Sequence, residues 1–275
     1  MTNAHYENFP VASPLLPPEL RAPVRVIYAF ARSADDLADE GDASASERIA
    51  SLNAYERELD HIDAGRATSS ELFVQLALTL KENHLNTQLL RDLLSAFRQD
   101  VVQTRYDSFD ELLDYCSRSA NPVGRIMLAL SEQYSPEMLD QSDAICSALQ
   151  LINFLQDVAI DWKKSRIYIP QEDLAKFSVS EQLISEGKAD HRWRALMQFQ
   201  VARARSLMLK GAPLATHVGG RLGWELRFIV HGGLRILEKI ESVHYDVLNR
   251  RPILKPYDWL LLGWRALRYE SSLAS

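Results

Sequence analysis

Apolar residues recur every three or four positions along most of this chain, and that spacing is typical of amphipathic helices. Val24, Ile27, Phe30, Ala34 and Ala38 are one example. No window of alternating apolar and polar residues is long enough to indicate a sheet. Neither an internal repeat nor a change in composition divides the 275 residues. The sequence therefore predicts an all-α fold, with a single domain over residues 1–275.

Local signals predict where several helices begin and end. Ser44 and Glu47 have the spacing of a capping box, and Gly65 is a suitable end for the helix that follows them. Thr68 and Asn86 stand at the expected starts of the next two helices. The later part of the chain is expected to hold a long helix from position 135, a polar stretch over 171–190, and two more long helices at about 191–210 and 220–249.

Composition narrows the class of protein. Hydrophobic residues make up 47% of the chain and charged residues 25%, which indicates a folded globular protein. The net charge of −6 lacks the basic footprint of a nucleic-acid-binding protein. The two cysteines, Cys116 and Cys146, are far apart, as expected for a reduced intracellular protein. Met1–Pro10 has no signal-peptide pattern and no apolar run reaches membrane-spanning length, so we expect a cytoplasmic location.

Two acidic pentads are the candidate chemical sites. Asp35 and Asp39 frame the first, and Asp157 and Asp161 frame the second. Residues four apart lie on one face of a helix, so each pentad presents two carboxylates side by side. Carboxylates inside an apolar helical pattern are costly unless a cation compensates them. Such pairs suit Mg²⁺ and the diphosphate that Mg²⁺ binds.

Each pentad alone has a second interpretation. Asp36, Glu40 and Asp42 crowd the same helix end as the first pair, where the helix dipole favours basic residues. That pentad is either a cation site or a solvated acidic helix end. The second pentad is followed by Lys163, Lys164 and Arg166. These are either cations for phosphate oxygens or lysines that stabilise a helix end.

The two pentads lie in motifs that resemble those of the squalene and phytoene synthase family. The segment 28–39 is similar to the first aspartate-rich motif of that family, and 149–170 is similar to the second. The resemblance extends from about His5 to about Tyr245. The segments 5–13 and 119–124, and the second motif's Asp-Val-Ala-Ile-Asp-Trp form, most resemble the bacterial hydroxysqualene synthase branch of hopanoid biosynthesis.

The resemblance implies an all-helical isoprenoid synthase fold with a central active-site cavity. It implies that Asp35, Asp39, Asp157 and Asp161 are catalytic and hold Mg²⁺ against the substrate diphosphate. Asp36 is turned about 100° from Asp35 on a helix and ranks lower. Arg32, one turn before Asp35, is expected to reach diphosphate oxygens. Further positions expected at the substrate are Tyr115, which we count as catalytic, and His5, Phe9, Tyr28, Gln150, Asn153, Gln156, Lys164, Arg166 and Tyr168.

The branch resemblance also implies a reaction. Magnesium and arginine stabilise the leaving diphosphate of presqualene diphosphate, and an apolar, aromatic-lined cavity protects the carbocation. After rearrangement, one water is the nucleophile, so no NADPH is expected. The alternative is a head-to-head prenyl synthase making presqualene diphosphate, squalene or phytoene from prenyl diphosphates.

Two positions depart from the wider family pattern. Ile160 stands where a glutamate is common, and Gln156 stands where an arginine is common. Both changes remove polar groups that help manage diphosphate and metal. We therefore expect one diphosphate substrate per turnover. Gln156, Asn121 and Ser119 are candidates to hold the quenching water, although for each of them we favour the alternative of a structural hydrogen-bonding residue.

The C-terminal run from Trp259 to Trp264 has four leucine or glycine residues between two tryptophans. A C30 substrate partitions into lipid, so this run is a candidate for peripheral membrane contact. The alternative is that these side chains close the core. The oligomeric state is not indicated by the sequence.

Overall fold

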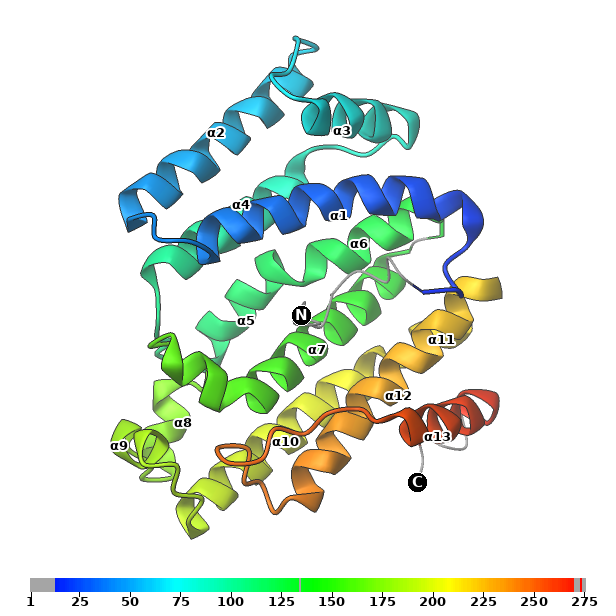
Figure 1. Cartoon of the computed structure of the whole chain (residues 1–275). Helices are drawn as coiled ribbons and strands as arrows, with labels where there is room; N and C mark the ends of the chain where they lie inside the picture. The colour runs from blue at the N-terminus through cyan, green and yellow to red at the C-terminus, as the bar shows by residue number, and fades with distance from the viewer. Residues whose placement is uncertain (1–12, 134, 270–272, 274–275) are drawn as a thin grey trace. The chain divides into compact units, whose positions relative to one another are not determined.

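A computed structural model of the chain describes residues 13–133, 135–269 and 273 (Figure 1). All regular elements within these ranges are helices, which make up 74% of the structure. The all-α prediction is confirmed. No helix in the described ranges is both long and apolar enough to cross a bilayer.

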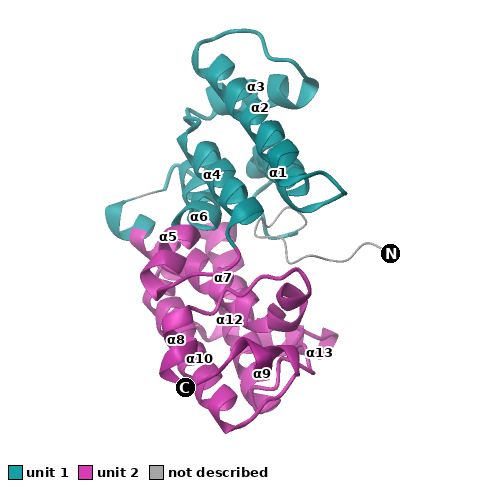
Figure 2. Ribbon diagram, turned by 90° about the vertical axis from the view of Figure 1, so that its left-hand side faces the viewer, with its two compact units in different colours: residues 1–103, 117–139 teal, residues 104–116, 140–275 magenta. Residues whose placement is uncertain are grey.

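The chain forms two compact units (Figure 2). Unit 1 comprises residues 1–103 and 117–139, and unit 2 comprises residues 104–116 and 140–275. Each unit is described separately below. The prediction of a single domain stays a prediction.

Unit 1 is built around its first helix, which contacts the other helices of the unit. Its apolar face includes Phe30, whose ring meets Tyr55 at 5.7 Å and Phe73 at 6.0 Å between centroids. Aromatic rings at such separations add to the free energy of packing beyond their buried area. The helices of this unit are α1 (Pro18–Asp39), α2 (Ala45–Asp63), α3 (Glu71–Glu82), α4 (Gln88–Val102) and α6 (Asn121–Leu130).

The predicted start signals of unit 1 have mixed outcomes. The capping box is confirmed, because the Glu47 amide donates to Ser44 Oγ and the Ser44 amide donates to the Glu47 carboxylate. The start at Thr68 is wrong, since α3 follows Ser70 as its N-cap. Asn86 contributes to the start of α4, where its Oδ1 accepts a 3.0 Å hydrogen bond from the Gln88 amide. Short polar side chains next to a helix compete for the same cap, which limits prediction to within two residues.

Unit 2 contains the longest helix of the described chain, α7 (Pro136–Lys163), from residue 140 onward. Its other helices are α5 (Phe109–Ser119, with 109–116 in this unit), α8 (Gln171–Lys176), α9 (Glu181–Ser185), α10 (His191–Gly211), α11 (Leu214–His217), α12 (Gly220–Ser242) and α13 (Pro256–Leu267). The polar stretch thus holds two short helices that the sequence did not indicate. The predicted helix 220–249 ends early, because His244 and Tyr245 adopt positive φ of 54° and 61°.

Glycines allow close helix packing around α7. An added Cβ at Gly211 of α10 would lie 2.5 Å from the Gln141 carbonyl oxygen, and one at Gly233 of α12 would lie 3.2 Å from Ile152 Cδ1. Close approach of the α7 backbone leaves no room for a side chain at Gly211, whereas at Gly233 the space is filled by neighbouring side chains. Three long helices of unit 2 therefore meet where the sequence has glycine.

A Gly211→Ala variant is expected to unfold more easily, by about 1–3 kcal/mol, because the methyl group overpacks a rigid backbone contact. Gly263→Ala on α13 is the matched control. Nothing lies within 4 Å of an added Cβ there, so its higher helix propensity should raise stability by up to about 1 kcal/mol. Urea denaturation of the two variants measures the difference. Equal stabilities would contradict the close approach at Gly211.

Stability should also depend on pH through His231, which is 1% exposed on α12. Burial, with the charge of Arg265 as a second cause, lowers the pKa of His231 from 6.5 to about 4. The unfolded chain then binds a proton that the folded chain does not, so stability falls as pH drops from about 7.5 to about 5, by roughly 2 kcal/mol. Urea midpoints at both pH values test this, with His231→Gln expected to flatten the slope.

Candidate active site

The first predicted motif forms a polar stripe along α1. Tyr28, Arg32, Asp35 and Asp39 are spaced so that they share one side of the helix, and each is half-buried. The adjoining side of the helix carries buried apolar residues that hold α1 in unit 1. Packing of that apolar side fixes which way the acidic pair points. The structure therefore places these four predicted residues together.

Arg32 is already surrounded by carboxylates. Its guanidinium lies 3.3 Å from Asp35, 2.7 Å from Asp36 and 3.1 Å from Glu40. One positive charge faces three negative ones, so this end of α1 keeps an excess of negative charge. Asp36, which we ranked below Asp35 for metal binding, is the nearest of the three to Arg32. A divalent cation at Asp35 and Asp39 would compensate the remaining charge.

Arg48 explains how the acidic end of α1 is tolerated. From α2 it donates to the carbonyl oxygens of Leu37, Glu40, Gly41 and Ala43 at 2.7–3.2 Å. Leu37 is in the last turn of α1 and Glu40 is its C-cap, so these carbonyls have no intrahelical partners, and the other two belong to the connection to α2. The guanidinium also opposes the negative end of the helix dipole. Sequence reasoning missed this residue, because only the turn between α1 and α2 brings it back to the helix end.

The second predicted motif forms a matching stripe along α7. Gln150, Asn153, Asp157 and Asp161 share one side of the helix, and each is half-buried. Neighbouring positions on α7 are buried, including Leu151, Phe154 and Val158. The stripe is thus a polar line on a helix that is otherwise packed within unit 2.

Arg251 is the main addition that the structure makes to this stripe. It forms a two-pronged ion pair with Asp157, whose side chain is 14% exposed. Hydrogen bonding to Asp157 raises the pKa of Arg251 despite its burial, and the charges of Asp157 and Asp161 add to the effect. Arg251 lies 94 positions after Asp157 (251 minus 157), so no local pattern could pair them. The only signal was the Arg250-Arg251 doublet.

Gln156 holds the segment that carries Arg251. It is 7% exposed, and its Nε2 donates to the Pro252 carbonyl oxygen. This contact supports the structural interpretation of Gln156. Its predicted place at the substrate stays a prediction.

A tight turn places the basic residues beside the second pentad. The amides of Lys164 and Arg166 both donate to the Asp161 carbonyl oxygen at 2.9 Å, and Ser165 adopts a φ of 60°. Arg105 donates to the Ser165 carbonyl oxygen at 2.6 Å and fixes this turn. The backbones of Lys164 and Arg166 are therefore held against the end of α7 at Asp161, where cations could serve phosphate oxygens.

Four aromatic residues form a buried cluster one helical turn before Asp157. Phe154 of α7 stacks on Tyr168 with ring centroids 3.7 Å apart, and Tyr115 of α5 lies 6.1 Å from Tyr168. Tyr106 completes the cluster at 5.4 Å from Tyr115. The four are 0–9% exposed. Tyr115 and Tyr168 were predicted at the substrate, whereas Tyr106 and Phe154 were missed.

The donor sets fit magnesium that is shared with a substrate. In residues 13–133, 135–269 and 273, no three carboxylate, imidazole or thiol side chains converge on one point. Each aspartate pair alone therefore offers two carboxylates. Mg²⁺ in proteins is commonly held by one or two carboxylates plus substrate phosphates and water. His5 and Phe9 lie outside the described residues.

Two Glu-x-x-His sequences, the spacing used by di-iron carboxylate proteins, occur at Glu58–His61 and Glu241–His244. The Glu58 carboxylate accepts the Ser69 amide at 2.9 Å, and the Glu241 carboxylate pairs with Arg205 at 2.8 Å. Both carboxylates thus have structural partners. In the part of the chain that the structure describes, neither sequence belongs to a group of three possible metal ligands, which a di-iron site would need.

The described chain is helical and carries two helix-borne aspartate pairs, each next to an arginine, which are residues that could hold a divalent cation and an anionic ligand. Comparison with protein families identifies it further. The squalene/phytoene synthase family profile matches residues 2–258. The chain belongs to this family.

Known proteins of more than one activity are similar to the chain. It is 34% identical to the hydroxysqualene synthase of Rhodopseudomonas palustris over 266 residues, covering 96% of this chain and 89% of that enzyme. It is 33% identical to the 15-cis-phytoene synthase of Synechococcus elongatus over 263 residues, covering 91% and 85%. The crystal structure of squalene synthase HpnC from Alicyclobacillus acidocaldarius aligns with a TM-score of 0.81 and 36% identity, covering 88% of this chain and 90% of that one.

Proposed function

We propose that this protein is a magnesium-dependent hydroxysqualene synthase. It ionises presqualene diphosphate, rearranges the carbocation and captures water, giving hydroxysqualene and diphosphate. Members of its family process prenyl diphosphates. The observation that carries the proposal is the pairing of half-buried aspartates with arginine on α1 and again on α7.

The aspartates and arginines divide the work of binding diphosphate. Asp35, Asp39, Asp157 and Asp161 are the proposed magnesium ligands, and bound magnesium would stabilise the negative charge of the leaving group. Arg251, which pairs with Asp157 in the structure, can turn its guanidinium to diphosphate oxygens once that carboxylate has another cation. Arg32 can do the same from Asp35. Guanidinium groups suit this exchange, because they bind carboxylate and phosphate in the same two-pronged geometry.

The aromatic cluster is suited to the hydrocarbon part of the reaction. Breaking the carbon–oxygen bond leaves a carbocation that water would consume. Tyr106, Tyr115, Phe154 and Tyr168 are buried and apolar over most of their surface. Their ring faces attract a cation by about 0.5–2 kcal/mol each, and they supply no strong base to remove its proton. We propose that this cluster lines the path of the carbocation.

Two features favour water capture over condensation of two prenyl diphosphates. The positions that are commonly charged in the wider family are Ile160, which is 42% exposed, and Gln156, whose amide is bound to Pro252. The second motif thus has fewer polar groups for a second diphosphate. Among the described residues, the buried Ser119 hydroxyl has no hydrogen-bond partner, which makes it our candidate to hold the water.

The alternative function is head-to-head synthesis of presqualene diphosphate, squalene or phytoene. It is supported by sequence identity, because the chain is 33% identical to a 15-cis-phytoene synthase and 34% identical to a hydroxysqualene synthase.

Product analysis separates the two functions. Purified protein is incubated with magnesium and presqualene diphosphate without NADPH, and in parallel with farnesyl diphosphate alone and geranylgeranyl diphosphate alone. Hydroxysqualene from the first reaction, with little C30 or C40 product from the other two, is expected. Efficient condensation of either shorter diphosphate would support the alternative instead. If none of the three is consumed, both proposals fail.

The C30 substrate and product are lipids, so we also propose that the enzyme works in peripheral contact with the cytoplasmic face of the membrane. No membrane insertion is needed for such contact.

A further inference from the structure

The C-terminal helix α13 has an inverted arrangement of polar and apolar residues. Its inner side carries Asp258, which is 0% exposed and bonded to Arg235 and Lys239 of α12 at 2.8 Å each. Arg265, also on the inner side, pairs with Glu238 of α12 at 2.6 Å. A surface helix normally buries its apolar face and exposes its charges. Here charged residues are used to attach the helix to its own unit.

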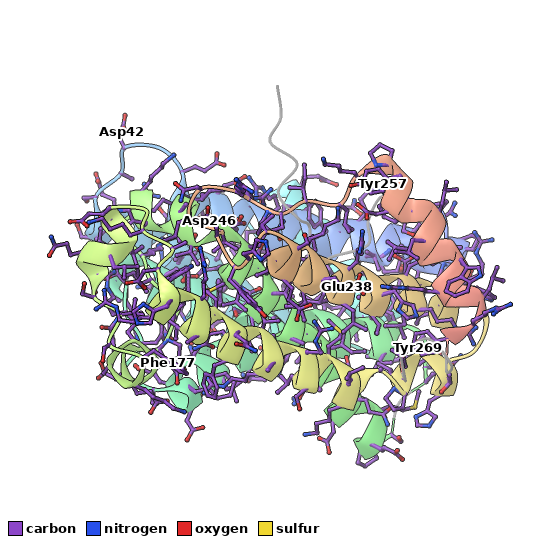
Figure 3. All side chains as sticks on the ribbon, turned by 90° about the horizontal axis from the view of Figure 1, so that it is seen from below. Asp42, Phe177, Glu238, Asp246, Tyr257 and Tyr269 are labelled. Carbon is purple, nitrogen blue, oxygen red and sulfur yellow. The ribbon has the colours of Figure 1, made fainter. Side chains whose placement is uncertain are left out.

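The outer side of α13 is apolar along its whole length. Tyr257, Leu260, Trp264 and Leu267 follow one another at helical spacing and are 52–80% exposed, and Trp259 beside them is 57% exposed. In Figure 3, Tyr257 lies at the outer edge of α13, whereas Glu238 lies inward on α12. Single exposed apolar residues need no explanation, but a contiguous stripe indicates an interaction surface.

Basic residues border this stripe. Lys255 precedes the helix, Arg268 follows it, and both are exposed. The Arg268 guanidinium lies 5.2 Å from the Trp264 ring centroid. Residues 250–268 contain five basic residues and one acidic residue, the buried Asp258, although the whole chain has a net charge of −6. The apolar stripe therefore lies in the basic part of an acidic protein.

We propose that the outer side of α13 docks onto an anionic lipid bilayer, with the helix lying along the membrane surface. This inference deepens the proposed function and rests on it for its purpose, because a docked enzyme would take its C30 substrate from the lipid. Tryptophan and tyrosine prefer the interface between headgroups and hydrocarbon, and lysine and arginine attract anionic headgroups. Twelve residues of helix span only about 18 Å, so α13 lies on the bilayer and does not cross it.

Charge argues against a second copy of the chain as the occupant. Two α13 helices packed face to face would bring Lys255 of one copy against Lys255 or Arg268 of the other. Like charges at such a contact are unfavourable. Anionic headgroups compensate the same residues.

Vesicle flotation of the full chain, without substrate, tests the proposal. The probes are phosphatidylcholine vesicles, with and without phosphatidylglycerol. A double variant, Leu260→Gln with Trp264→Gln, is expected to lower the binding constant at least about tenfold.

A matched control, Leu78→Gln with Val102→Gln, also changes two exposed apolar residues but lies in unit 1, and should bind as the unaltered protein does. Replacing Lys255 and Arg268 by glutamine should weaken binding to the anionic vesicles by about fivefold per residue.

The outcomes separate docking from the proposed function. Turnover of detergent-solubilised presqualene diphosphate should be the same in the α13 double variant as in the unaltered protein. If the unaltered protein floats with neither vesicle, or if the double variant floats equally well, the docking proposal is overturned while the reaction can still stand. A change in oligomeric mass on sedimentation, confined to the α13 variant and without vesicle binding, would assign the stripe to self-association and overturn lipid docking.

Discussion

An Asp157→Asn variant is expected to lose about 10³-fold in kcat/KM toward the diphosphate substrate, the scale of loss when one preorganised electrostatic group is removed. The asparagine keeps the shape of the side chain but removes the charge that would bind magnesium. It also removes the charged partner of Arg251, which we propose binds the diphosphate. Steady-state kinetics across a series of magnesium concentrations measures the loss.

The magnesium dependence distinguishes a metal ligand from a structural carboxylate. Asp157→Asn should raise the magnesium concentration needed for half-maximal rate. Arg251→Gln should instead raise KM and leave the magnesium requirement nearly unchanged, because this residue is proposed to contact diphosphate and not metal. Opposite behaviour of the two variants would contradict the roles assigned to them.

Asp140→Asn is the matched control on the same helix. Asp140 is exposed near the start of α7, four turns or more from the polar stripe's aspartates. Its activity should equal that of the unaltered protein. Folding should change little in either variant, since Arg251 is 41% exposed and can be hydrated when its partner is lost. If Asp157→Asn retains most of the activity with an unchanged magnesium requirement, the α7 pair is not the metal site.

The two polar stripes could be predicted because their determinants are local. Helical periodicity alone places Asp35 with Asp39 and Asp157 with Asp161, and the apolar residues around them determine which side of each helix is buried. The capping box at Ser44 is equally local. Within one helix, sequence spacing and spatial position are nearly the same thing.

The residues that were missed depend on the tertiary structure. Arg48 reaches the end of α1 only after the chain has turned, and Arg251 reaches Asp157 from the segment that follows α12. In the sequence, Tyr106 and Phe154 are typical core aromatics. Only the structure shows that Tyr106 packs against Tyr115 and Phe154 against Tyr168. Sequence spacing carries no information on such contacts. The arginines and the aromatic cluster of the site therefore become apparent only in the tertiary structure.

An Asp258→Ala variant is expected to lower the free energy of unfolding by about 3–5 kcal/mol, the usual result of removing one partner of a buried ion pair. Asp258 accepts hydrogen bonds from Arg235, from Lys239 and, at 2.7 Å, from the Lys255 amide. Burial would raise the pKa of Asp258, but these donors outweigh it and lower the pKa to about 2. Its removal leaves Lys239, whose side chain is only 11% exposed, without its ion-pair partner.

Urea denaturation at neutral pH measures the effect, with Asp246→Ala as the control on a half-exposed carboxylate of the same unit. Limited proteolysis should show cleavage near residues 250–256 in Asp258→Ala before the rest of unit 2 is cut. If Asp258→Ala lowers the free energy of unfolding by less than about 1 kcal/mol, the ion pairs behave like those of a protein surface, and the buried network is contradicted.

Because polar and apolar residues are inverted on α13, Asp258→Ala is expected to cost more stability than the loss of an ordinary surface ion pair. A helix that exposes its large apolar side chains contributes few of them to its own attachment; only Leu262 and Ala266 are buried apolar residues of α13. The ion pairs with α12 must therefore supply much of what holds it. If Asp258→Ala also abolishes vesicle flotation while leaving turnover in detergent intact, the same network that anchors α13 inward is what presents its apolar stripe outward.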